Sequence, residues 1–307
     1  MAAQPAALAI DVNFTRLSMR ASFVNPSLPQ FAKYTRIIED ALASRRLPPR
    51  KLRKPGSPCF HHRMSWDFWL IFFILGIVIP WRGYARMRQL MALPEVTGRD
   101  RIKMYLATIL FQWLLAALVA WRAFARGLSL HELGIHGTAG VSLLAVTLIG
   151  AALIAASHWA NVRRMARSDH PNLQRLRALG SRLFPRSRPE LALFVVLSLT
   201  AGICEEFLFR GFVMAALFRT GLPTWLVVAL SSAMFGVAHL YQGKGGSVGT
   251  GILGMLFAGV RLAYQSLLPA VVWHAVLDIV AGIAGTRFLL HSAGKVGEPE
   301  VLGEIHR

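Results

Sequence analysis

Seven apolar segments, each 16 to 28 residues long, lie between Trp66 and Leu290 and constrain the fold of this chain more than any other feature. Helices of about 20 apolar residues cross a hydrocarbon core that is about 30 Å thick. The runs are continuous and lack the alternation of membrane strands, so helices are expected. The sequence therefore predicts an all-α, polytopic transmembrane helical bundle with about seven spans: Trp66–Trp81, Met104–Trp121, Ala139–Ala160, Leu191–Phe218, Thr224–Tyr241, Gly249–Tyr264 and Leu268–Leu290.

The overall composition agrees with a membrane location. Only 16% of the 307 residues are charged and 54% are apolar, whereas soluble domains have about 25% charged residues. The formal net charge of +19 is explained by Lys and Arg in loops that face the cytoplasm and anionic lipid. We expect membrane lipid as a partner and no nucleic acid, because the sequence contains no nucleic-acid-binding motif.

The N-terminal 64 residues differ from the rest of the chain. They contain eleven Lys or Arg and three acidic residues, with a Pro-rich basic run at 45–55. A segment of this kind cannot bury enough apolar surface to fold. We therefore predict a disordered basic tail at residues 1–64, followed by a membrane helical domain at 65–300.

The basic residues between the spans predict the orientation. Segments 82–103 and 161–190 contain six and eight Lys or Arg, whereas 122–138 contains two. Because cytoplasmic loops are enriched in Lys and Arg, we expect the first two segments to be cytoplasmic, in a bacterial plasma membrane. This orientation leaves the basic tail outside, against the same rule. Either Trp66–Trp81 does not fully cross the membrane, or natural translation starts at Met64. N-terminal peptide mass spectrometry of the native protein would distinguish these two alternatives.

Ionisable residues inside the last four spans are the candidates for chemistry. A charged side chain at the centre of a membrane costs about 2.5–3.5 kcal/mol on insertion scales, so each one needs a partner or a purpose. The first two spans are nearly free of such groups. The fourth, fifth and seventh spans contain Glu205, Glu206 and Arg210, then Phe235 and His239, then His274 and Asp278.

The two glutamates are expected to point in different directions. Glu206 and Arg210 are four residues apart, so they share a helix face and can form an ion pair. Glu205 lies about 100° round the helix from Glu206. We therefore predict that Glu205 points elsewhere and has no basic partner.

The same spacing of four relates Phe235 to His239 and His274 to Asp278. Three helices thus each present one polar stripe, and together the stripes would enclose a wet cavity. A carboxylate and a histidine can activate water, and a second histidine can donate to an oxyanion. Alternatively, His239 and His274 could bind Zn²⁺ together with Glu205 or Asp278. Phe235 is expected to pack and to shape a substrate pocket.

The order Glu-Glu-x-x-x-Arg, Phe-x-x-x-His and His-x-x-x-Asp, each in its own apolar span, resembles the three motifs of the CPBP family. This family comprises the type II CAAX prenyl proteases and the bacteriocin-processing (abortive-infection) proteins. The resemblance covers residues 190–290 and implies an intramembrane peptidase whose catalytic core is that region. Members of the family are described variously as metalloproteases and as glutamate proteases, and both types remain open here.

The resemblance also implies roles for six residues: activation of water by Glu205 and His239, orientation by Glu206 and Arg210, and support of an oxyanion or a metal by His274 and Asp278. The last motif position is often Asn in the family. An ionised Asp cannot donate a hydrogen bond. Asp278 must therefore be protonated, orient His274 by accepting its N–H, or ligate a metal.

These observations predict an intramembrane endopeptidase that hydrolyses a peptide bond of a membrane-associated protein or peptide, with water activated by Glu and His and with or without Zn²⁺. A proton- or ion-coupled transporter could use the same carboxylates and histidines as a relay. The sequence contains no long internal repeat of the kind found in many transporters. A non-catalytic immunity or scaffold protein on the same fold is a further alternative.

Overall fold

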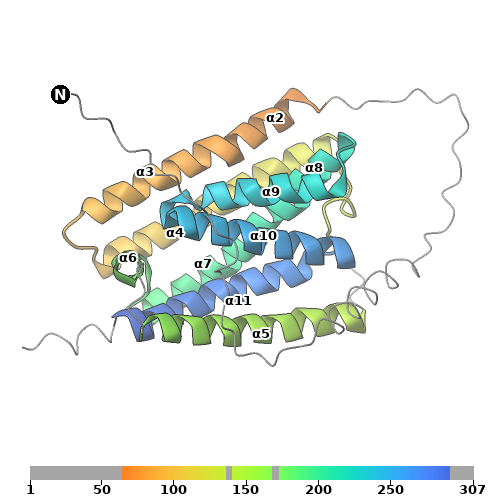
Figure 1. The fold of residues 1–307 in the computed structure, drawn as a ribbon. Helices are drawn as coiled ribbons and strands as arrows, with labels where there is room; N and C mark the ends of the chain where they lie inside the picture. Colours follow the sequence, from red (N-terminus) through yellow and green to blue (C-terminus); the bar gives the residue numbers. More distant parts are fainter. Residues whose placement is uncertain (1–63, 136–139, 168–172, 291–307) are drawn as a thin grey trace, which may run out of the picture. The chain divides into compact units, whose positions relative to one another are not determined.

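The computed structural model describes residues 64–135, 140–167 and 173–290, and every regular element in these ranges is a helix (Figure 1). Residues 1–63, which make up the predicted disordered tail up to Met64, lie outside the described residues. In chain order the elements are α2 (Trp66–Phe73), the π-helix η2 (Ile74–Val78), α3 (Ile79–Ala92), α4 (Gly98–Ala125), α5 (Val141–Met165), α6 (Leu173–Leu183), α7 (Arg188–Glu206), the π-helix η3 (Phe207–Val213), α8 (Met214–Arg219), α9 (Thr224–Ala238), the 3₁₀ helix η4 (Leu240–Gln242), α10 (Lys244–Tyr264), α11 (Leu268–Ala284) and the π-helix η5 (Gly285–Leu290).

The prediction of an all-α membrane bundle is confirmed. Large apolar side chains such as Leu110, Leu148 and Val248 are exposed on these helices, as expected where lipid surrounds them. The helix in the fifth predicted span, α9, is shorter than a typical span. Six helices are long and apolar enough to cross a membrane: Trp66–Ala92, Gly98–Ala125, Val141–Met165, Arg188–Arg219, Lys244–Tyr264 and Leu268–Leu290. The chain is therefore an integral, multi-pass membrane protein.

The first span is longer than the sequence predicted. Helix continues from Trp66 through η2 and α3 to Ala92, so most of the predicted loop 82–103 is helical. Hydropathy shows where a helix leaves the apolar layer, not where its hydrogen bonding ends. Exposed arginines such as Arg82 and Arg86 can extend from a helix into water without breaking it. The segment 161–190 likewise contains the end of α5 and the whole of α6.

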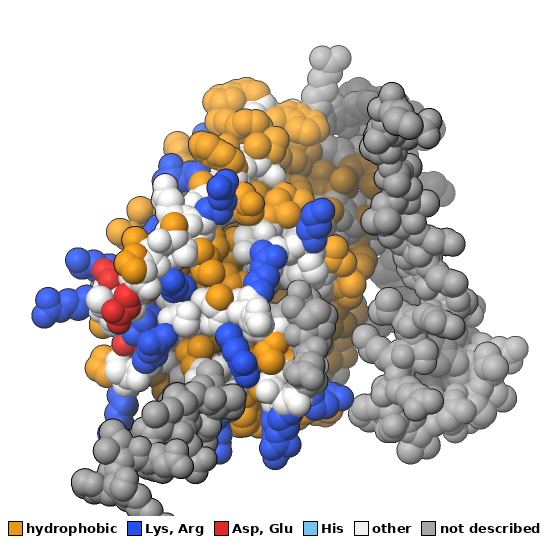
Figure 2. Space-filling model, turned by 60° about the vertical axis from the view of Figure 1, so that its left-hand side comes forward, with side chains coloured by type: hydrophobic (Ala, Val, Ile, Leu, Met, Phe, Trp, Pro, Cys, Tyr) orange, Lys and Arg blue, Asp and Glu red, His pale blue; other side chains and the backbone are white. Residues whose placement is uncertain are grey.

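The two basic segments lie at the same end of the bundle. Arg101 at the start of α4 pairs with Glu190 at the start of α7, with 2.7 Å between Arg101 Nε and Glu190 Oε2. Glu190 also lies in the first turn behind the N-cap Ser187, where a carboxylate is favoured by the helix dipole. Figure 2 brings this end forward and shows Lys and Arg side chains spread over it.

Two further ion-pair groups lie at the opposite end, where α4 ends and α8 ends. Asp67 at the start of α2 is buried and accepts hydrogen bonds from Arg122 and, at 3.0 Å, from Arg126 Nε. Glu132, after α4, pairs with Arg219 at the end of α8. These contacts fasten the ends of these helices to one another.

Small residues allow the helices that carry the candidate motifs to approach closely. A Cβ atom added to Gly202 of α7 would lie only 2.7 Å from the Val271 carbonyl oxygen of α11. A Cβ on Gly236 of α9 would lie 3.2 Å from the Cα of Gly251 in α10. Close packing of this type is common between membrane helices. It brings the glutamates of α7 beside α11, and α9 beside α10.

Candidate active site

A buried ion pair anchors the candidate site where α7 continues into η3. Arg210 Nη1 donates to Glu206 Oε1 at 3.0 Å, and both side chains are fully buried. The same carboxylate oxygen lies 2.8 Å from Nδ1 of His274 on α11. The predicted Glu206–Arg210 pair is thus present, and Glu206 also connects α7 to the histidine of the third motif.

Glu205 points away from this pair, toward α4 and the two histidines. Gln112 Nε2 of α4 donates to Glu205 Oε1 at 2.7 Å. The other oxygen, Oε2, lies 3.8 Å from His239 Nε2 and 3.9 Å from His274 Nε2. Among the described residues no Lys or Arg pairs with Glu205. The amide partner Gln112 was not predicted.

The hydrogen bonds of the two histidines fix which nitrogen faces Glu205. His239 Nδ1 lies 2.8 Å from the Phe235 carbonyl oxygen, which can only accept, so we assign the proton to Nδ1. His274 Nδ1 faces the Glu206 carboxylate, and the same assignment follows. Both Nε2 atoms therefore face Glu205 Oε2. Their separations from it are too long for direct hydrogen bonds and suit a water-sized group between the three atoms.

His239 reaches this position because α9 ends at the residue before it. Its backbone leaves the helix with φ −101° and ψ 18°, and η4 follows at once. The predicted span Thr224–Tyr241 is therefore too long at its C-terminal end. The side-chain contact with the Phe235 carbonyl satisfies one of the carbonyl groups that a helix end leaves without a partner.

Asp278 lies at the more open side of the cluster. Its Oδ2 atom is 3.7 Å from His274 Nε2, and its side chain is 34% exposed. That separation exceeds a hydrogen bond. The His274 Nδ1–H instead faces Glu206, so Glu206 orients His274, the role that the sequence also allows for Asp278.

Phe235 forms a wall of the site. Its side chain is only 2% exposed, and its ring lies 4.0 Å from the guanidinium carbon of Arg210 and 4.7 Å from the His239 ring. A cation over an aromatic face is stabilised by the ring quadrupole. Phe235 therefore packs as expected, against both Arg210 and His239. The substrate-pocket role remains a prediction.

As the side chains are arranged, they lie slightly farther apart than zinc ligands do, and the Zn²⁺ hypothesis stays a prediction. Tetrahedral ligands at about 2.0–2.2 Å from zinc lie about 3.3–3.6 Å from one another. The Nε2 atoms of His239 and His274 are farther than that from Glu205 Oε2. In the part of the chain that the structure describes, no group of three His, Cys, Asp or Glu side chains is arranged to hold a metal ion.

Two residues of the site were missed by the sequence analysis. Gln112 is an amide in the middle of an otherwise apolar span, and the cost of burying a polar group in a membrane was a usable signal. Tyr241 in η4 has its ring 5.7 Å from the His239 ring. Nothing in the sequence distinguished Tyr241 from an aromatic residue at a membrane interface.

Gly254 of α10 provides the space for Arg210. A Cβ atom there would lie 2.8 Å from Arg210 Nη2 and 3.3 Å from Ser232 Cβ. Because Arg210 is fully buried against Phe235, it cannot move away freely. We expect Gly254→Ala to destabilise the protein by about 1–3 kcal/mol through overpacking, measured by thermal unfolding in detergent micelles.

Gly259 on the same helix is the matched control. A Cβ there meets no atom within 4 Å, and alanine is favoured over glycine in helices by about 1 kcal/mol. Gly259→Ala should therefore be neutral or stabilising. Equal stability of the two variants would show that Gly254 does not make room for Arg210.

Comparison with known proteins identifies this region. Residues 187–280 match the family model described as Rce1-like, Type II CAAX prenyl endopeptidase Rce1-like. The match begins at the N-cap of α7 and ends within α11, and it contains Glu205 and the other six motif residues of the candidate site. It confirms the family resemblance predicted from the motifs. No curated protein and no solved structure shows significant similarity to the chain.

Proposed function

We propose that this protein is an intramembrane endopeptidase of the glutamate type, in which Glu205 and His239 activate the water that attacks a peptide bond. The observation that carries the proposal is the position of Glu205 Oε2, with His239 Nε2 at 3.8 Å and His274 Nε2 at 3.9 Å. The Glu205 carboxylate oxygen and the His239 nitrogen can bind, orient and deprotonate one water molecule, and the His274 nitrogen lies beside them.

These side chains are sufficient for every proton transfer that the hydrolysis requires. Glu205 accepts a proton from water while His239 Nε2 accepts the second hydrogen as a hydrogen bond, and the hydroxide oxygen attacks the carbonyl carbon. Negative charge moves to the carbonyl oxygen, where a protonated His274 Nε2 donates to it. The C–N bond then breaks, and the proton on Glu205 passes to the leaving nitrogen. The products are a carboxylic acid and an amine, and transfer of the acid proton to the amine gives a carboxylate and an ammonium group.

The surrounding side chains have positioning roles in this proposal. Glu206 holds His274 through Nδ1, Arg210 holds Glu206, and Gln112 holds Glu205 through Oε1. Hydrogen bonds of this kind hold a catalytic group in the geometry needed for attack, and small displacements from that geometry lower the reaction rate strongly. Asp278, the most exposed of the group, lies where substrate would enter.

The proposed substrate is a membrane-associated protein or peptide. Glu205 lies 17 residues after Arg188 in a helix of 32 residues, about 26 Å along its axis, so the bond to be cleaved must reach the interior of the bundle. The family description names CAAX prenyl endopeptidases, which makes a lipidated C-terminal peptide the first class to test. We place the segments 82–103 and 161–190 on the cytoplasmic side of a bacterial plasma membrane.

An N-terminal peptide survey of membrane proteins tests the proposed function. Cells that express the wild-type chain should contain new N-termini in membrane proteins, and these should be absent with Glu205→Gln. A transporter or a non-catalytic scaffold predicts identical N-termini in the two samples, and that result would overturn the proposal. The exposed Glu95→Gln variant is the control, and it should match the wild type.

Asp278→Asn distinguishes an oxyanion role from a metal role. If the cluster of His274 and Asp278 supports an oxyanion, the asparagine variant should retain or gain activity, because an amide can donate. If Asp278 ligates Zn²⁺, activity should fall and recover when Zn²⁺ is added. Loss of activity without metal rescue would contradict both roles. The assay is peptide cleavage in proteoliposomes over a range of Zn²⁺ and chelator concentrations.

A further inference from the structure

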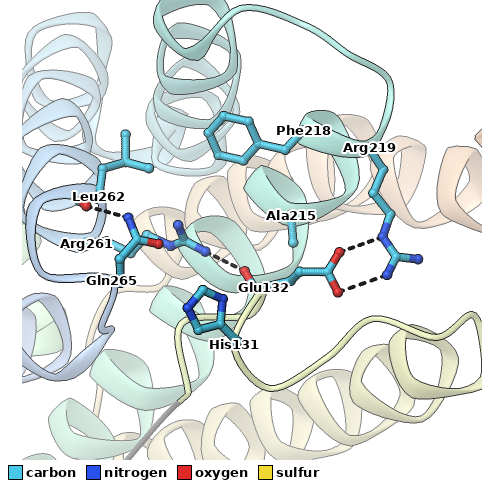
Figure 3. Close-up of a pocket in the computed structure, with 8 residues that line it drawn as sticks. All are labelled: His131, Glu132, Ala215, Phe218, Arg219, Arg261, Leu262 and Gln265. Carbon is cyan, nitrogen blue, oxygen red and sulfur yellow. Dashed lines mark hydrogen bonds and ion pairs between the residues drawn. The ribbon is translucent and has the colours of Figure 1, made fainter. Parts of the chain in front are cut away.

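A second candidate site lies at the opposite end of the bundle from the basic segments. It is a pocket of about 350 Å³ whose walls come from the segment after α4, the end of α8 and the end of α10 (Figure 3). It shares no lining residue with the candidate active site. Apolar side chains, Phe218 and Leu262, line it together with Arg219, Arg261 and Gln265.

Arg261 is the unusual member of this pocket. Its side chain is buried, with the residue only 3% exposed, and Nη2 donates to the Glu132 backbone carbonyl. Within the described ranges its Nε atom has no hydrogen-bond partner and the side chain forms no ion pair. A buried cation without an opposite charge is costly.

The other buried arginines each have a carboxylate partner. Arg101 pairs with Glu190 and Arg210 with Glu206. Among the described residues Arg261 has only a backbone carbonyl as its partner. The contrast indicates that the counter-charge of Arg261 comes from outside the described part of the chain.

Glu132 lines the same pocket, but its carboxylate is already paired with Arg219. Arg219 Nε and Nη2 donate to its two oxygens at 2.8 and 2.9 Å. Hydrogen bonds from Arg219 and Ser129 hold the pKa of the Glu132 carboxyl well below its usual range, at about 2. Glu132 is therefore ionised and paired with Arg219 at neutral pH, and the charge of Arg261 remains uncompensated.

We propose that this pocket binds an oxyanion of the phosphate class, with Arg261 as its main charged contact. A phosphate oxygen accepts strong, charge-assisted hydrogen bonds from a guanidinium. The neighbouring apolar walls, Phe218 and Leu262, suit the glycerol and acyl part of a phospholipid. The source of the phosphate group is therefore a lipid headgroup or free inorganic phosphate, and the experiment separates the two.

The test is the apparent melting temperature of the purified full-length protein in neutral detergent micelles. Sodium phosphate is compared with sodium chloride at equal ionic strength, and short-chain phosphatidylglycerol with phosphatidylcholine of equal chain length. A ligand at ten times its Kd should raise the melting temperature by about 3 °C. A rise with phosphatidylglycerol alone identifies a lipid site, and a rise with phosphate identifies a site for the free anion. No rise with either probe over its control overturns the proposal.

Two variants and a control locate the effect. Arg261→Gln should abolish the stabilisation by the effective probe. Gln265→Glu places a carboxylate four residues from Arg261 in the same pocket, so it should supply the missing charge internally, remove the response and leave the unliganded protein stable. This second variant keeps the test valid if Arg261→Gln does not fold. Arg88 is exposed on α3, and the Arg88→Gln control should show the same rise in melting temperature as the wild type. An undiminished rise in both pocket variants would show that the probe binds elsewhere and would overturn the proposal.

Discussion

Replacing Glu205 with glutamine is expected to lower kcat for peptide cleavage by about 10²–10⁴-fold, the usual contribution of a general base. Glutamine keeps the size of the side chain and its hydrogen bond with Gln112 through an amide oxygen, but it cannot accept the proton from water. Because the change removes a charge from the membrane interior, insertion and folding should be unaffected. The measurement is single-turnover cleavage of an identified substrate peptide in proteoliposomes, together with thermal unfolding.

A second variant distinguishes the role of Glu205 as the base from the role of Gln112, which positions Glu205. Gln112→Leu leaves the Glu205 carboxylate in place but removes its amide donor, which lies 2.7 Å away. We expect a smaller fall in kcat than for Glu205→Gln, with KM unchanged. Activity of Glu205→Gln within about tenfold of the wild type would exclude Glu205 as the base. A KM effect of Gln112→Leu without a kcat effect would instead indicate contact with substrate.

The sequence predicted the parts of this site that depend on a single helix. The Glu206–Arg210 pair follows from the spacing of residues along α7 and η3, and the structure has the pair at 3.0 Å. The number of spans follows from the length of the apolar runs, since the membrane sets that length. Helix ends were less predictable, because the helix from Trp66 runs past its apolar part to Ala92.

Contacts between helices could not be predicted in the same way. His274 and Asp278 were grouped because they are four residues apart, yet His274 Nδ1 contacts Glu206 of another helix at 2.8 Å. That contact depends on how closely α7 and α11 approach at Gly202. The partner of Glu205 is on α4, 93 residues away in the chain. Without pairing information between spans, periodicity alone cannot decide which polar stripes meet.

The ion pair that supports the site is expected to show strong coupling between its two members. Arg210→Met should destabilise the protein by about 3–5 kcal/mol, because it leaves the fully buried Glu206 carboxylate without its cation. The methionine keeps the volume of the side chain and its packing against Phe235. Glu206→Gln should be destabilising for the complementary reason, since Arg210 then has no counter-charge. Unfolding in mixed detergent micelles with increasing denaturing detergent provides the free energies.

The double variant, Glu206→Gln with Arg210→Met, distinguishes a coupled pair from two separate packing effects. It removes both charges, and the amide oxygen of glutamine can still accept from His274 Nδ1, which lies 2.8 Å from the present carboxylate. Replacing both members of a buried pair by neutral groups is often harmless. We therefore expect the double variant to be more stable than Arg210→Met alone, with a coupling energy at or above about 3 kcal/mol. Additive losses would contradict a coupled pair and would indicate that Arg210 acts by packing against Phe235. Because Glu206 lies one residue from Glu205 and contacts His274, a stable double variant with low activity would further show that the pair is needed for the chemistry and not for the fold.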